Sequence, residues 1–161
     1  MINIFNPAKV FKDELSASWA SNIKTTRKGS QKISIDKTGT PPVLVLEALP
    51  EVEYFIGVLP LNRNWKAVDL TEYKHIKFNI TTSKTEYPEV DIQLVSGEND
   101  EEVDSDSISL SEYGLMEECE QEFIIPIEEF TGDGYNIHNV KTIKIIGCGN
   151  FNMKLSGVVI E

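Results

Sequence analysis

Apolar and polar residues alternate one by one along much of this chain. The segment His75–Thr81 reads HIKFNIT, so Ile76, Phe78 and Ile80 point to one side of an extended backbone and their polar neighbours point to the other. Alternation with a period of two predicts a β-strand with one buried face, because a helix repeats its apolar positions about every 3.6 residues. The same pattern recurs in four later segments: Val90–Val95, Glu122–Ile127, Thr142–Ile146 and Phe151–Leu155.

Other segments predict strands of a different kind. Val43–Ala48 and Glu53–Leu59 are apolar on both sides, which is typical of strands that are covered on both faces. Gln31–Asp36 and Ser105–Leu110 are shorter candidates. We therefore expect about nine or ten strands, spaced as in two antiparallel sheets that pack face to face.

Turn residues separate these segments and leave little room for helices. Clusters of Gly, Pro, Asn, Asp and Ser stand between the strand candidates, and no long segment has a helical period. Short helical turns are expected only at Leu70–Tyr73 and Pro126–Phe130. The chain of 161 residues fits one domain over residues 1–161. The sequence thus predicts a single all-β sandwich.

Charge and composition restrict the partners of such a domain. The chain carries 26 acidic and 15 basic residues, a formal net charge of −11. This charge repels phosphate backbones and anionic lipid headgroups, so neither nucleic acid nor a membrane surface is an expected partner. Cys119 and Cys148 lack metal-ligand spacing; we expect two buried thiols, with a disulfide as the alternative.

Several segments, taken together, follow the sequence pattern of one known family of domains. WKAVDLTEYKHIKFNI, which begins at Trp65, is similar to their segment of an aromatic residue, Asp-Leu-Ser-x-Tyr and Leu/Ile-x-Phe. EQEFIIPIEEF resembles their Ile-Pro-Leu-x-x-Phe strand, and NVKTIKIIGCG with FNMKLSGVVIE resembles their two closing strands. VFKDELSASW and VDIQLVSGEND resemble their opening segment and a middle strand. The chain thus resembles the jelly-roll carbohydrate-binding modules of the galactose-binding-like architecture. The resemblance implies a jelly-roll topology and non-covalent binding of a polysaccharide.

Two positions depart from the pattern of these modules. Cys119-Glu120-Gln121 stands where family members often have a Trp, and Ser156 stands where their last strand often has an Asp near a structural calcium. The acidic loop Glu98–Asp106 offers three aspartates but lacks the spacing and the glycine of an EF-hand, so it is expected to be solvated. We therefore expect no metal and no cofactor.

Sugar binding needs aromatic surfaces for the apolar faces of pyranose rings and polar side chains for the hydroxyls. Asp91 and Gln93 are two residues apart on one strand and project to the same side. Polar residues of neighbouring strands are expected to join them on one open sheet face, and two aromatic rings are candidates for stacking. The additional candidates are Asn79, Glu122, Lys144, Tyr54 and Trp19.

Nothing in the sequence predicts catalysis. His75 and His138 have no nucleophile motif nearby, and no pair of carboxylates stands out. The most specific hypothesis is a non-catalytic module that binds a β-glucan; a module of this kind can be part of a larger multidomain protein. The alternative is a structural or protein-interaction sandwich whose polar faces carry only cross-strand charge pairs. No signal peptide is recognisable, so the location is extracellular if this is an excised module and cytoplasmic if the chain is complete.

Overall fold

The computed structural model describes residues 1–5, 31–36, 38–39, 43–48, 54–61, 66–82, 89–97, 101–148 and 152–161. Within these ranges the chain forms strands and two short 3-10 helices but no α-helix. The strands are β1 (Ile2–Phe5), β2 (Gln31–Asp36), β3 (Val43–Ala48), β4 (Tyr54–Pro60), β5 (His75–Thr82), β6 (Val90–Ser96), β7 (Val103–Asp104), β8 (Ile108–Ser109), β9 (Gln121–Pro126), β10 (Val140–Cys148) and β11 (Asn152–Ile160). The 3-10 helices are η4 (Ile127–Glu129) and η5 (Ile137–Asn139).

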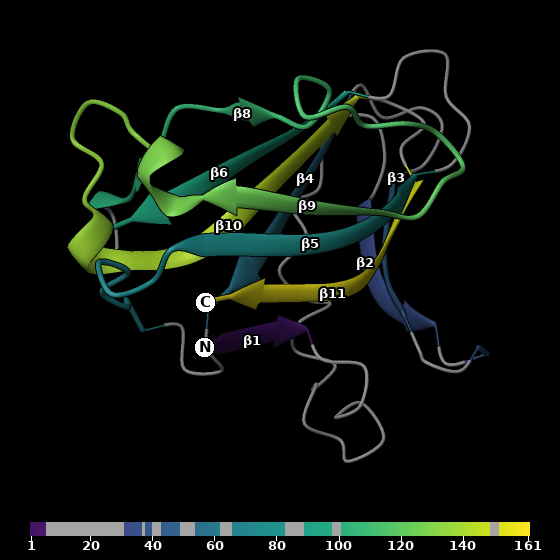
Figure 1. Cartoon of the computed structure of the whole chain (residues 1–161), viewed down its shortest axis with the longest axis horizontal. Coiled ribbons are helices and arrows are strands. Elements are labelled where there is room, and N and C mark those ends of the chain that lie inside the picture. Colours follow the sequence, from purple (N-terminus) through teal and green to yellow (C-terminus); the bar gives the residue numbers. More distant parts are fainter. Residues whose placement is uncertain are drawn as a thin grey trace.

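The strands build two antiparallel sheets. The six-stranded sheet has the order β2-β3-β11-β5-β9, with β1 paired to β11, and the five-stranded sheet has the order β4-β10-β6-β7, with β8 paired to β6. In Figure 1 the strands β5, β9 and β11 lie in front of β4, β6 and β10. From β3 to β6 and again from β9 to β11, successive strands change sheet, which is the connectivity of a jelly roll. The predicted all-β sandwich with jelly-roll topology is confirmed.

The core lies between the two sheets, on the side of each strand that the alternation predicts. In β5 the side chains of Ile76, Phe78 and Ile80 are fully buried, whereas the residues between them are half-exposed. Phe55 of β4 and Ile145 of β10 meet them from the opposite sheet, in the same core cluster. Burial of a large apolar side chain contributes roughly 1.5–3 kcal/mol, so this shared interior holds the two sheets together.

Strand boundaries agree with the sequence prediction where the alternation is clear and differ elsewhere. The prediction for Gln31–Asp36 and for Val43–Ala48 is confirmed without change. The strand β1 was not expected, and β11 runs on to Ile160 because Val158 and Ile160 also enter the core. A short helix was rightly expected after Pro126, whereas residues 71–72 form only a turn.

Two further expectations concern cysteine and the membrane. The prediction of two buried thiols is wrong for Cys119, which is free and exposed because it lies in the loop before β9. The side chain of Cys148 lies outside the described residues. In the ranges that the structure describes, no helix is both long enough and apolar enough to cross a membrane.

Candidate functional site

The polar candidates from the sequence lie on two different sheets. Asp91 and Gln93 are on β6, and Lys144 on β10 is the register partner of Gln93, so these three belong to the five-stranded sheet. Asn79 on β5 and Glu122 on β9 are register partners in the six-stranded sheet. All five point away from the core, but in a sandwich the two outward faces look in opposite directions. The expectation of one common face is therefore wrong, and the candidates form two groups.

The two aromatic candidates cannot be placed in either group. Trp19 lies outside the described residues. The backbone of Tyr54 begins β4, opposite Cys148 of β10, but its side chain lies outside what is described. The stacking role expected for both rings therefore stays a prediction.

The outward side of β4, β10 and β6, here called the β10 face, combines apolar and polar residues in adjacent rows. Lys144 stands between Val58 of β4 and Gln93 of β6. In the next row, Ile146 stands between Ile56 of β4 and Asp91 of β6. Apolar side chains thus lie beside a carboxylate, an amide and an ammonium group.

One end of the β10 face is buried. Thr142 and Val95 are register partners on its outward side, yet each is only 4% exposed. The side chain of Lys144, one row further along, is 15% exposed. By contrast, Ile124 on the outward side of the six-stranded sheet is 43% exposed. The β10 face is therefore a sheltered surface, whereas the opposite face is half-buried at Asn79 and Thr81 and exposed along β9.

The segment around β7 fixes the polar side chains of the β10 face. Gln93 Nε2 donates to the carbonyl of Ser105 at 2.8 Å, and Lys144 Nζ forms an ion pair with Asp104 Oδ2. Ser105 itself is buried, and its Oγ accepts a hydrogen bond from the Leu94 amide at 3.0 Å. Gln93 and Lys144 are thus held in place, and the amide oxygen of Gln93 keeps its capacity as an acceptor.

Asp91 has the most perturbed carboxyl group on this face. Burial raises the pKa of Asp91 above its usual value, and a hydrogen bond from the side chain of Ser109 partly offsets that effect. The charges of Glu89 and Glu112 also raise the pKa. A half-buried carboxylate with few partners is a strong acceptor for a hydroxyl group, because water competes with it less than at an open surface.

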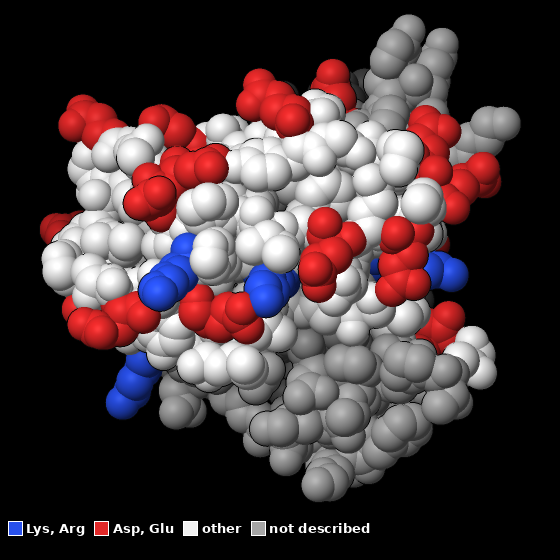
Figure 2. All heavy atoms as spheres, in the orientation of Figure 1, with Lys and Arg blue, Asp and Glu red and all other residues white. Residues whose placement is uncertain are grey.

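The outward face of the six-stranded sheet is occupied by contacts among its own residues. Lys77 Nζ lies 2.5 Å from Glu161 Oε1, and Ser156 Oγ donates to Glu120 Oε1 at 3.0 Å. Asn79 lies over Gly157, where a Cβ would meet its Nδ2 at 3.3 Å. Figure 2 shows basic and acidic side chains alternating across this side of the molecule. Cross-strand charge pairs of this kind need no ligand to explain them.

The acidic loop has contacts of its own. Asp104 pairs with Lys144, and Asp106 Oδ2 accepts a hydrogen bond from Thr131 Oγ1 at 3.4 Å. Asp100 lies outside the described residues. Among the residues that are described, no group of three or more His, Cys, Asp and Glu side chains is arranged to hold a metal ion.

Sequence reasoning missed Ser105 and Ser109, which support Gln93 and Asp91 from the neighbouring segment. Both serines lie in the Ser105–Leu110 candidate strand, but only Ile108–Ser109 pairs as β8 there. Their positions beside Gln93 and Asp91 follow from the pairing of β7 and β8 with β6, for which the sequence carried no signal.

Comparisons with known proteins agree with this fold. The model of the family described as carbohydrate binding domain 30 matches residues 7–160. The chain is 20% identical to the family 30 carbohydrate-binding module of the cellulosomal cellulase Cel9D-Cel44B of Clostridium thermocellum, with a TM-score of 0.69 over 87% of this chain and 86% of that one. It is 12% identical, with a TM-score of 0.61, to the Clostridium thermocellum family 11 module in complex with a β-1,3-1,4-mixed-linked tetrasaccharide, over 84% and 85% of the two chains. A module of family 28, specific for non-crystalline cellulose, is 15% identical with a TM-score of 0.50 over 80% of each chain. No match was found among the curated proteins.

The fold and these comparisons together define a carbohydrate-binding module, a class of β-sandwich domains that bind sugars and are themselves non-catalytic. Within that class the chain belongs to carbohydrate-binding domain family 30, because the model of that family spans nearly the whole sequence. The resemblance expected from the sequence is confirmed, as is the assignment to carbohydrate binding.

Proposed function

We propose that this module binds a β-glucan chain on the β10 face. The observation that carries the proposal is the combination of Asp91, Gln93 and Lys144 with apolar residues on a sheltered sheet surface. The relatives support the polymer class. The family 11 structure holds a β-1,3-1,4-linked tetrasaccharide, the family 28 module is specific for non-crystalline cellulose, and the family 30 module comes from a cellulase.

The chemistry of a glucan chain fits the two kinds of residue on this face. A β-linked pyranose presents apolar C–H faces, which pack on Ile56 and Ile146, and equatorial hydroxyls at its edges. Asp91 accepts a hydrogen bond from one hydroxyl, the Gln93 amide oxygen accepts one from a second hydroxyl, and Lys144 donates a hydrogen bond to a sugar oxygen. Because Ser105 and Asp104 already hold Gln93 and Lys144, little side-chain entropy is lost when the sugar binds.

Affinity electrophoresis in gels that contain a soluble β-glucan tests the proposal. Mixed-linked β-1,3-1,4-glucan and hydroxyethylcellulose should both slow the wild-type protein. Asp91→Ala should weaken the interaction by about two- to twelvefold, which corresponds to the loss of one hydrogen bond of about 0.5–1.5 kcal/mol. Added salt should change the retardation little, because a neutral glycan is not subject to charge screening.

Asn79→Ala and Glu122→Ala are the matched controls, since both residues are outward and polar but lie on the other sheet. These two variants should bind as the wild type does. If they lose binding while Asp91→Ala keeps it, the glycan lies on the six-stranded sheet and the proposed face is wrong. If no β-glucan in a broad panel of polysaccharides slows the wild type, the β-glucan proposal fails.

A further inference from the structure

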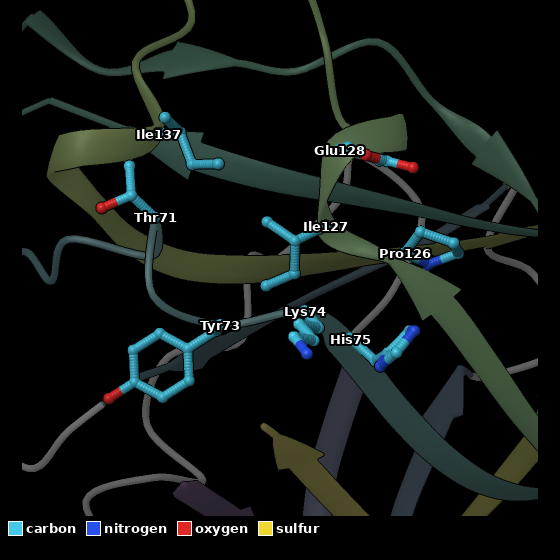
Figure 3. A pocket seen from close by; sticks show the side chains of 8 residues that line it. All are labelled: Thr71, Tyr73, Lys74, His75, Pro126, Ile127, Glu128 and Ile137. Atoms are coloured by element: carbon cyan, nitrogen blue, oxygen red, sulfur yellow. The ribbon is translucent and has the colours of Figure 1, made fainter.

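A pocket of about 460 Å³ lies at one end of the sandwich, away from the β10 face. Its walls come from the turn before β5, from the end of β9 with η4, and from η5 (Figure 3). The lining residues are Thr71, Tyr73, Lys74, His75, Pro126, Ile127, Glu128 and Ile137. The volume lies within the range of about 300–1,000 Å³ that is usual for small-molecule sites.

Backbone hydrogen bonds between these segments form the pocket in advance of any ligand. The Ile127 amide donates to the Lys74 carbonyl at 2.9 Å, and the Leu70 amide donates to the Ile137 carbonyl at 3.0 Å. His75 and Pro126 are register partners of β5 and β9, so one wall continues the outward side of the six-stranded sheet. The β10 face belongs to the other sheet, and the two places are therefore separate.

The lining has an apolar floor and a polar rim. In Figure 3 Ile127 lies in the middle of the lining residues, and the ring of Tyr73 is seen face-on with its hydroxyl directed away from the other labelled side chains. Ile127 is only 2% exposed, and Tyr73 is half-buried against the edge of the core. Within the described ranges, the side chains of Lys74, His75 and Glu128 make no hydrogen bond or ion pair, unlike the Lys77–Glu161 pair nearby.

The rim fits a neutral ligand better than a charged one. Lys74 and Glu128 carry opposite charges on the same rim, so together they select neither an anion nor a cation, and the net charge of −11 disfavours an anion further. Lys74 donates hydrogen bonds, Glu128 accepts them and His75 can do either, so the rim suits a molecule that carries both donors and acceptors. The ring of Tyr73, which is only half-buried, adds a surface for C–H groups.

The geometry points to a second carbohydrate site here, which takes one or two neutral pyranose units at the end of the sandwich. This site goes beyond the proposed β-glucan face and does not depend on it. Its small, bounded volume distinguishes it from an open sheet surface that runs along a polymer.

Titration of the ¹⁵N-labelled protein with glucose, cellobiose, laminaribiose and cellotetraose, followed by two-dimensional NMR, tests the second site. At least one of these sugars should shift the amide resonances of Lys74, His75 and Ile127. Tyr73→Leu keeps an apolar side chain but removes the ring, and it should weaken this effect by about two- to twelvefold. Lys74→Ala should also weaken it, whereas Lys154→Ala, an exposed lysine on β11, should not.

The two sites are read out separately in the same spectra. Shifts confined to residues around Asp91 would overturn the second site and leave the proposed function standing. Shifts confined to the pocket, weakened by Tyr73→Leu and unaffected by Asp91→Ala, would support the second site and overturn the β10 face. If none of the four sugars shifts the pocket resonances, or if Tyr73→Leu and Lys74→Ala both bind as the wild type does, the inference is wrong.

Discussion

Replacement of Ser105 by alanine should destabilise the domain more than the replacement of an exposed serine does. Ser105 is 2% exposed, and its Oγ accepts from the Leu94 amide at 3.0 Å and donates to the Asp106 carbonyl at 3.0 Å. Leu94 is fully buried, so no water can reach its amide once the hydroxyl is gone. A buried donor left without a partner costs about 1–3 kcal/mol of unfolding free energy.

Urea denaturation followed by far-ultraviolet circular dichroism measures this cost, with Ser107→Ala as the control because Ser107 is exposed. The Ser105→Ala midpoint should fall clearly below that of the control. For a domain of this length the same loss lowers the melting temperature by about 2–12 °C. If the two variants differ by less than about 0.5 kcal/mol, Ser105 does not fasten the β7 segment to β6 and the reasoning is refuted.

Three further substitutions have defined outcomes. Burial raises the pKa of Asp91 in the folded state, so ionisation of this carboxyl lowers the unfolding free energy as the pH rises through that pKa. Asp91→Asn should therefore raise the unfolding free energy more at about pH 7 than near pH 3. An equal increase at both pH values would contradict this. Gly97 has φ +99°, and a Cβ there would lie 2.4 Å from the Glu101 carbonyl oxygen. Gly97→Ala should therefore lower the unfolding free energy by about 1–3 kcal/mol. An unchanged unfolding free energy in urea denaturation would show that the turn adapts to the added methyl group. The hydroxyl of Tyr135 is buried without a hydrogen-bond partner among the described residues, and burial raises its pKa to about 12. Tyr135→Phe should therefore melt at the same temperature as the wild type or at a higher one. A drop of several degrees would show that the hydroxyl does form a hydrogen bond.

The sequence was a reliable guide to which side of a strand is buried. The order of Ile76, Phe78 and Ile80 in β5 depends only on the alternation of side chains along an extended backbone, which is a local property. The same reasoning correctly placed Asp91 and Gln93 on one outward surface. The sequence of each strand by itself therefore predicts which of its side chains are buried.

Sheet membership is not local, and this is where sequence reasoning failed. Asn79 and Glu122 have the same outward parity as Asp91, but β5 and β9 pair with each other in the opposite sheet. Pairing between strands depends on contacts between residues far apart in the chain, such as Lys144 with Gln93. The alternation that predicts an outward polar residue therefore does not predict to which sheet that residue belongs.

The end pocket was equally hidden from sequence reasoning. Tyr73 lies in a segment expected to be a short helical turn, and Ile137 lies in a 3-10 helix that was not expected. Hydrogen bonds from separate loops bring the two together. A pocket made from three turns has no periodic pattern in the sequence, because each turn contributes only a few residues.

The pairing of β1 with β11 also determines how the domain responds to tension. Ile2 is the register partner of Ile160, so the first and last strands lie antiparallel with their outer ends side by side (Figure 1). A force that draws these two residues apart loads the pair at one end and opens it one hydrogen bond after another, as a zipper opens, instead of shearing all bonds at once. The first part to yield is thus the edge near Ile2. The β10 face belongs to the other sheet, and its strands keep their register while β1 peels away.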